Sequence, residues 1–197
     1  MARDTRERIV RVARDLVHGA SMAQVSVEEI CAAAGVHKGS LYHFFPSKDA
    51  LGVAVLDANW ALMRALLEEA FGDDVPPLVR IDRFVDGYAG MLALMRERMG
   101  ATPGCPLGNL AAEVSSRDGE MRTRIVRIMD AWARYFVEAV REARGRGDVG
   151  PAVDADEVAV HILAHLQGMA TMARAYDRPE LAGRARGGVR MLLGLPA

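Results

Sequence analysis

The fold is decided by residues 25–48, which read VSVEEICAAAGVHKGSLYHFFPSK. Ser26 and Glu29 have the spacing of a capping box, in which each side chain bonds the backbone of the other residue at the start of a helix. Gly35 can end this helix, because glycine adopts the left-handed conformation without a Cβ clash. A second short helix should follow directly and stop at Pro46. Two short helices joined by a tight glycine turn predict a helix-turn-helix.

The second of these helices has the polar face of a helix that enters the major groove of DNA. Lys38 can neutralise a phosphate, and the hydroxyl and imidazole groups beside it can hydrogen-bond phosphate oxygens or base edges. Backbone amides near Val27 can hold a phosphate at the start of the first helix. An ordinary helix pair with a solvated polar face is the alternative. The side chains that we expect to reach DNA, or to leave room for it, are those of Lys38, Gly39, Ser40, Tyr42, His43 and Lys48.

The segment GVHKGSLYHFFPSKDAL, residues 35–51, is very similar to the recognition-helix signature of the TetR family of transcriptional regulators. The similarity covers about the first quarter of the chain, and the rest resembles the family only in length and helical layout. The resemblance implies a homodimeric repressor with a variable ligand-binding domain after its DNA-binding head. Carried over by position, it implies DNA contacts at Ser26, Val27, Lys38, Gly39, Tyr42, His43 and Lys48. His37, where the family often has serine or another small residue, completes the predicted set.

Composition predicts a folded protein without a general affinity for nucleic acid. The chain has 197 residues, of which 51% are hydrophobic and 26% charged, and its net charge is -1. This hydrophobic content is too high for a disordered chain. Because the net charge is close to zero, affinity for DNA must come from a local surface. The two cysteines, Cys31 and Cys105, do not form a disulfide framework and indicate a reducing interior.

We expect neither a signal peptide nor a membrane span. Residues 1–16, MARDTRERIVRVARDL, are charged and contain no apolar core segment. The most apolar later stretch, about residues 158–173, is interrupted by His161, His165 and Gln167, which makes it a poor membrane span. The predicted location is therefore the cytoplasm, with no membrane partner.

The remainder of the chain predicts helices alone. Apolar residues recur at helical spacing over about residues 5–18, 47–71, 78–99, 107–115, 118–144, 154–176 and 179–193. There is no strand-like alternation and no internal repeat, so the fold class is all-α, with eight or nine helices. We expect a three-helix DNA-binding domain over residues 1–47 and a larger helical ligand-binding and dimerisation domain over residues 48–197.

The middle helices are rich in methionine and aromatic residues, which could line a chamber for a small molecule. Methionine is polarizable and fills irregular space, and a few polar side chains could orient a ligand. Ordinary core packing is the alternative for any one of these residues, and the chamber rests mainly on the family resemblance. The predicted lining is Trp60, Met63, Tyr88, Met91, Cys105, Leu107, Asn109, Trp132, Phe136, His165, Gln167 and Met169.

The last two helices predict a subunit interface. Gly187 and Gly188 each cost about 1 kcal/mol relative to alanine within a helix, so contacts outside the helix should compensate. A two-fold interface of two helices from each subunit would do so, and burial within one subunit is the alternative. Two recognition helices could then lie about 34 Å apart and read a palindrome. The predicted interface residues are Val158, Ile162, Leu166, Met169, Leu181, Ala185, Val189 and Leu192.

Three features allow other chemistry. His161 and His165 are four residues apart, a spacing that can hold a metal, but no acidic or cysteine partner stands at a telling distance. Cys105 precedes an expected helix start, where a thiolate is stabilised, so it is either a sensor of oxidants or electrophiles or a packed, inert thiol. The chain has no G-x-S-x-G motif and no paired-carboxylate pattern. We therefore predict no metal, no cofactor and no enzyme activity.

These features together predict a dimeric repressor that a small-molecule effector releases from double-stranded operator DNA. The long helix from Ser47 is the expected lever, because about 24 residues at helical rise span roughly 36 Å. The alternatives are a sensor repressor that acts through Cys105, a helical ligand carrier that no longer binds DNA, and a metal-binding helical enzyme.

Overall fold

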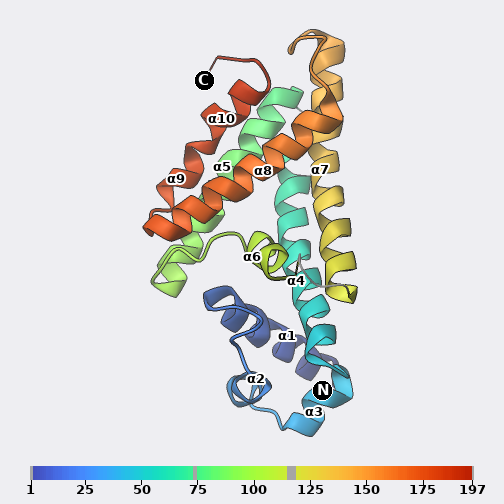
Figure 1. Cartoon of the computed structure of the whole chain (residues 1–197), viewed down its shortest axis with the longest axis vertical. Helices are drawn as coiled ribbons and strands as arrows, with labels where there is room; N and C mark the ends of the chain where they lie inside the picture. The colour runs from blue at the N-terminus through green and yellow to red at the C-terminus, as the bar shows by residue number, and fades with distance from the viewer. Residues whose placement is uncertain (1, 73–74, 115–118, 197) are drawn as a thin grey trace. The chain divides into compact units, whose positions relative to one another are not determined.

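The computed structural model describes residues 2–72, 75–114 and 119–196, and within them helices joined by loops are the regular secondary structure (Figure 1). The predicted all-α class is therefore confirmed. The helices are α1 (Ala2–Gly19), α2 (Val27–Ala34), α3 (Lys38–Phe44), α4 (Lys48–Ala70), α5 (Pro77–Met99), α6 (Pro106–Val114), α7 (Glu120–Arg146), α8 (Ala155–Tyr176), α9 (Glu180–Gly183) and α10 (Ala185–Leu192).

The observed helix bounds differ from the expected ones near the C-terminus. The single helix expected over about residues 179–193 is divided at Arg184 into α9 and α10. The expected helix end at Ser115 and the expected start at Asp118 lie outside the described residues.

Backbone contacts divide the chain into two compact units. The first contains residues 1–62 and 106–128, and the second contains residues 63–105 and 129–197. The division falls inside α4 and inside α7, so each of these long helices contributes to both units.

The core of the first unit joins α1, α2 and α3 to the start of α4. Ile9, Ile30, Leu41 and Leu51 are fully buried in it. Each such side chain stabilises the fold by about 1.5–3 kcal/mol relative to an exposed one. Phe45, which follows α3, is also buried and lies under the guanidinium of Arg6, 5.1 Å from the ring centre.

Glycine has a structural role at two positions of this unit. Gly35 has the left-handed angles φ 61° and ψ 44°, and this turn ends α2 and directs the chain into α3. Gly52 lies under the side chains of Met121 and Met22, since a Cβ at Gly52 would stand 2.6 Å from Met121 Sδ and 3.3 Å from Met22 Cε. The second position lets two methionines approach α4 closely.

The core of the second unit is a cluster of aromatic rings from α5 and α7. Phe84 stacks on Tyr88 with ring centres 5.9 Å apart, and Trp132 and Phe136 meet Phe84 edge to face at 5.9 and 5.6 Å. All four side chains are fully buried. Edge-to-face pairs contribute about 0.5–1.5 kcal/mol beyond their buried area.

The end of the chain packs closely on α8 within this second unit. A Cβ at Gly188 in α10 would stand 2.2 Å from His165 Nε2 in α8. The space that Gly188 leaves is therefore filled by a side chain of the same chain, so a partner subunit is not needed to explain this glycine.

By length and hydropathy, α4 could span a membrane. Among the described residues, no other helix is both long enough and apolar enough to do so. Core helices of water-soluble proteins meet the same two criteria. Leu51, Val55 and Leu56 of α4 are fully buried, so the helix contributes to the protein core.

Candidate functional site

The start of α2 is held by the predicted capping box. Ser26 Oγ accepts a hydrogen bond from the Glu29 backbone N–H at 3.1 Å, and Glu29 Oε2 accepts one from the Ser26 backbone N–H at 2.7 Å. Bonds from the Ser26 backbone and hydroxyl keep the pKa of Glu29 below its usual value. Val27 is 8% exposed. A DNA contact at Ser26 or Val27 would therefore be made mainly by the backbone.

α3 presents a continuous polar surface over a single buried anchor. Leu41 is fully buried in the first unit, whereas Tyr42 is 44% exposed. Five further residues that were predicted to contact DNA are also exposed on or beside α3, namely His37, Lys38, Gly39, Ser40 and His43. The sequence prediction and the structure agree on which side of α3 is free, although contact with DNA stays a prediction.

Lys48 opens α4 and is half-buried. It shares one property with Lys38: these are the two lysines of the chain, and every other fixed positive side chain is an arginine. Both lysines lie in the first unit, within the segment that was predicted to bind DNA.

Glu28 is a neighbour of the candidate interface that the sequence analysis did not include. Its carboxylate pairs with the Lys38 ammonium group between the start of α2 and the start of α3. The hydrogen bond to Lys38 lowers the pKa of Glu28, and the same bond raises the pKa of Lys38. Ten positions separate the two residues, across a turn, so no helical spacing connects them.

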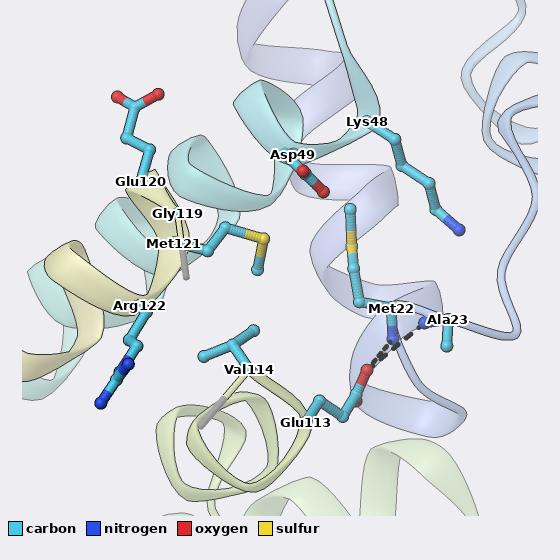
Figure 2. A pocket seen from close by; sticks show the side chains of 10 residues that line it. All are labelled: Met22, Ala23, Lys48, Asp49, Glu113, Val114, Gly119, Glu120, Met121 and Arg122. Atoms are coloured by element: carbon cyan, nitrogen blue, oxygen red, sulfur yellow. Dashed lines mark hydrogen bonds between the residues drawn. The ribbon is translucent and has the colours of Figure 1, made fainter. Parts of the chain in front are cut away.

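A cavity of about 210 Å³ lies within the first unit, and Lys48 is one of the residues that line it (Figure 2). Met22, Val114 and Met121 project into it, whereas Glu120 and Arg122 point away from it. Its complete lining is Met22, Ala23, Lys48, Asp49, Glu113, Val114, Gly119, Glu120, Met121 and Arg122.

One carboxylate at the cavity joins α6 to the loop between α1 and α2. Glu113 Oε2 accepts hydrogen bonds from the backbone N–H groups of Met22 at 2.9 Å and Ala23 at 3.3 Å (Figure 2). Sequence spacing could not have indicated this contact, because about ninety residues separate its two sides.

The structure brings together four of the residues predicted to line a ligand chamber, three aromatic rings and the Cys105 thiol. Tyr88, Trp132 and Phe136 belong to the ring cluster of the second unit, with the Tyr88 and Trp132 ring centres 6.0 Å apart. Burial, and secondarily the neighbouring Cys105 thiol, raise the pKa of Tyr88 well above its usual value. Among the described residues, neither the Tyr88 hydroxyl nor Trp132 Nε1 has a well-formed hydrogen bond, although both are buried.

The other predicted lining residues are divided between the two units, and their role in ligand binding stays a prediction. His165 Nε2 and Gln167 Nε2 on α8 are also buried without a hydrogen-bond partner in the described part of the chain. Met63 is buried, and Met91 and Met169 are half-buried. Three predicted lining residues belong to the first unit instead, namely the buried Leu107 and the half-buried Trp60 and Asn109.

The predicted interface residues need correction. Most of them are at most 5% exposed within the single chain, where they pack α8 and α10 into their own unit; these are Val158, Ile162, Leu166, Ala185 and Val189. Met169 and Leu181 are half-buried, and Leu192 is 37% exposed. The apolar stripe that we assigned to a partner subunit is therefore mostly the stripe that faces the protomer core.

The two histidines considered for metal binding lie on one helix. His161 is exposed on α8, and His165 packs against Gly188. Across residues 2–72, 75–114 and 119–196, no group of three or more metal-ligating side chains is gathered.

Two helices that meet at a left-handed glycine, with an exposed polar face on the second, define a helix-turn-helix protein, and sequence comparisons define its class as a bacterial transcriptional regulator. Residues 9–55 match the model for bacterial regulatory proteins of the tetR family, and residues 77–189 match that for the tetracyclin repressor-like C-terminal domain. The chain belongs to the TetR family, whose members are DNA-binding regulators and not enzymes.

Several named relatives are similar over most of the chain. It is 31% identical to the transcriptional regulator AcuR of Cereibacter sphaeroides, over 80% of this chain and 71% of the relative. It is 29% identical to the transcriptional repressor DhaR of Mycobacterium sp. strain GP1 and 30% identical to the transcriptional repressor NemR of Escherichia coli K12, each over 73% of this chain and 69% of the relative.

Solved structures share the fold. A regulatory protein TetR from Rhodobacter sphaeroides superposes with a TM-score of 0.83 at 27% identity, covering 94% of this chain and 97% of that one. A TetR regulator from Chloroflexus aurantiacus gives a TM-score of 0.85 at 27% identity, with coverage of 99% and 96%. The reduced form of E. coli NemR gives a TM-score of 0.80 at 24% identity, with coverage of 98% and 100%.

Proposed function

We propose that this regulator is a homodimeric repressor that binds a palindromic operator in the cytoplasm and is released by a small molecule. Residues 1–47 would form the DNA-binding head, and residues 48–197 would bind the effector and the second subunit. The observation that carries the proposal is the exposed polar face of α3 above the buried Leu41. Two relatives, DhaR and NemR, are named repressors.

Each part of the head has a defined role in this proposal. α3 lies in the major groove, where Tyr42 and His43 bond phosphate oxygens or base edges, and Gly39 leaves room for the sugar-phosphate backbone. Amides at the start of α2, near Val27, hold a phosphate. Lys48 binds the flanking phosphate backbone.

The second subunit would pack on the outer faces of α8 and α10. Val160 and Met172 of α8 are 59% and 42% exposed, and Met191 of α10 is 68% exposed. Ala164 and Gly168 are exposed between the two α8 residues at steps of four, and nothing lies within 4 Å of a Cβ built at Gly168. Small residues flanked by large apolar ones suit close packing against a partner helix.

The effector would satisfy buried polar groups of the second unit. A buried polar atom without a hydrogen bond costs about 1–3 kcal/mol, and Trp132 Nε1 is such an atom among the described residues. The buried Tyr88 hydroxyl has the Cys105 thiol as a neighbour, and a thiol is a weak hydrogen-bond partner. The indole N–H and the phenolic hydroxyl are both donors set among aromatic rings. A flat, largely apolar small molecule that carries a hydrogen-bond acceptor fits this chemistry.

A route from the effector to the head follows the chain itself. Cys105, beside the Tyr88 hydroxyl, directly precedes the first residue of α6, and Glu113 near the end of α6 holds Met22 and Ala23. A ligand that rearranges the surroundings of Tyr88 would move α6, and α6 would move the loop before α2. α4 is the second candidate lever. In either case the effector must bind the DNA-incompetent state more tightly than the DNA-bound state.

Footprinting on the DNA that flanks the protein's own gene tests this function. The expected result is a protected, two-fold-symmetric site that disappears on addition of an effective small molecule. Replacement of Lys38 and Tyr42 by alanine should abolish protection without changing the far-ultraviolet circular dichroism spectrum. Equal protection by this double variant would exclude α3 as the recognition helix, whereas the absence of any protected site with the unchanged protein would favour a ligand carrier.

Cys105 supports a second candidate, a repressor that senses oxidants or electrophiles. The thiol stands immediately before α6 and beside the Tyr88 hydroxyl, so a covalent change there would disturb the same route. The solved structure of one similar regulator, E. coli NemR, is of a reduced form. Release of DNA by peroxide in the unchanged chain, and not in Cys105→Ser, would favour this candidate over a purely non-covalent effector.

A further inference from the structure

An acidic side chain of α2 is joined to the lysine that begins α3. Glu28 and Lys38 form a hydrogen-bonded ion pair across the Gly35 turn. The Lys38 and Glu28 side chains are 55% and 66% exposed, so the pair forms part of the surface that the two helices present to solvent.

Glu28 is available for this role because the neighbouring acid is already engaged. Glu29 Oε2 accepts hydrogen bonds from the Ser26 backbone N–H and the Ser26 hydroxyl, both at 2.7 Å. The Glu28 carboxylate instead accepts a hydrogen bond from the Lys38 ammonium group. Mutual attraction holds the pKa of Glu28 below, and that of Lys38 above, its ordinary value, so both groups are charged at neutral pH.

This pairing changes what Lys38 can contribute to DNA binding. The electrostatic part of DNA affinity comes from positive side chains that neutralise phosphates. A lysine whose charge is balanced by a carboxylate adds little to that attraction, and the carboxylate itself is repelled by phosphates. The pair is therefore poorly suited to the sugar-phosphate backbone and better suited to the uncharged base edges of the major groove.

The donors and acceptors of the pair match one kind of base pair. A lysine ammonium only donates hydrogen bonds, whereas an ionised carboxylate only accepts them. In the major groove a G·C pair offers guanine N7 and O6 as acceptors, followed by the amino group of cytosine N4 as a donor. An A·T pair instead places its amino donor between two acceptors.

We infer that Lys38 and Glu28 act as one unit that reads a single G·C base pair in each operator half-site. Lys38 donates to guanine O6 or N7, and Glu28 accepts from cytosine N4. The inference rests on the proposed function, in which α3 lies in the major groove. It makes Glu28, a residue of the first helix of the motif, a determinant of operator sequence.

Selection from a pool of DNA duplexes with a randomised central region tests the inference on the full chain. The unchanged protein should enrich a symmetric motif with a G·C pair in each half-site. Glu28→Ala and Lys38→Met should each lose roughly tenfold discrimination at that same base pair and keep the other preferences. Asp15→Asn is the matched control, because it removes a carboxylate and an ion pair, with Arg14, elsewhere in the first unit.

Three results would contradict this reading. Tighter binding of every sequence by Glu28→Ala, with unchanged preferences, would make Glu28 a source of phosphate repulsion only. Losses at two different base pairs would show that Lys38 and Glu28 do not act together. Failure of the unchanged protein to enrich any motif would overturn the proposed function and this inference with it, whereas the first two results would leave the proposed function intact. Circular dichroism of each variant confirms that the helices are retained.

Discussion

The carboxylate of Glu113 accepts a hydrogen bond of 2.9 Å from the backbone N–H of Met22. A side chain of α6 thereby fixes the loop that leads into the helix-turn-helix, within one compact unit. The backbone N–H of Ala23 donates to the same carboxylate oxygen, so one side chain holds two adjacent amides of the loop.

Glu113→Ala should destabilise the first unit and weaken the response to effector. Loss of the carboxylate leaves two amide donors without their partner, and hydrogen bonds of this kind contribute about 1–3 kcal/mol. Urea unfolding measures the first effect, and the effector concentration needed to release operator DNA measures the second. Glu113→Gln, which keeps an acceptor oxygen, should lie between the alanine variant and the unchanged protein. An unchanged effector response in a destabilised Glu113→Ala protein would exclude α6 as the route.

Ser26→Ala should remove the side-chain cap of α2 and reduce stability by about 1 kcal/mol. The same bonds lower the pKa of Glu29, so their contribution is fully present above the ordinary glutamate pKa of 4.5 and is lost as the pH falls through the lower value of the folded protein. The difference in unfolding free energy between Ser26→Ala and the unchanged protein should therefore shrink in acid. Denaturant unfolding at pH 7 and below pH 4 measures it, with ~0.5 pH steps between them. A difference that grows in acid would contradict the assigned capping box.

Gly188→Ala should destabilise the second unit, because the added methyl would stand 2.2 Å from His165 Nε2. Such overpacking costs about 1–3 kcal/mol. Gly90→Ala in α5 is the matched control: nothing lies within 4 Å of its Cβ, so it should be neutral or slightly stabilising. The two substitutions are compared by thermal unfolding. The double variant Gly188→Ala with His165→Ala should recover part of the loss, and strictly additive effects would contradict the packing of these two residues.

Val160→Glu combined with Met172→Glu should give a monomer that binds operator DNA much more weakly. Both side chains are exposed on α8, so the changes leave the protomer core intact while placing charges in the proposed interface. Light scattering after size-exclusion chromatography measures the mass. Val79→Glu on α5, at a residue that is 41% exposed, is the control and should leave the mass unchanged. A dimer that survives the double substitution would place the subunit interface on another surface.

Local features of the head could be predicted because their signals lie within a few residues. The capping box requires only that Ser26 and Glu29 stand three residues apart. Gly35 could be identified as the end of α2 because glycine readily adopts a positive φ, here 61°. On α3, Leu41 is the apolar residue that is buried, so the polar residues on the opposite side of this short helix could be expected to face solvent.

Contacts between distant segments gave no such signal. The pair of Glu28 with Lys38 depends on the direction of the Gly35 turn, and that of Glu113 with Met22 depends on how α6 packs. Nothing in either sequence neighbourhood marks these residues as partners.

α8 shows why helical spacing alone could not identify the subunit interface. Val158 and Ile162 have the same spacing of four as Val160 and Ala164, yet the first pair is buried in the protomer and the second pair is exposed. Periodicity reveals that a helix has apolar sides but not which side meets its own chain. The family resemblance suggested a dimer. The residues of its interface could be proposed only once the packing of α8 within the protomer was known.

The placement of both lysines in the first unit has a practical consequence for measuring operator affinity. Among side chains, reagents that acylate or alkylate amines have only Lys38 and Lys48 to modify, so side-chain coupling to an amine-reactive biosensor chip, or labelling with a succinimidyl dye, would mask the surface under study. A tag joined at the end of the chain avoids this artefact. Conversely, protection of these two amines from acetylation by added duplex, read by mass spectrometry, would map the bound face without any mutation.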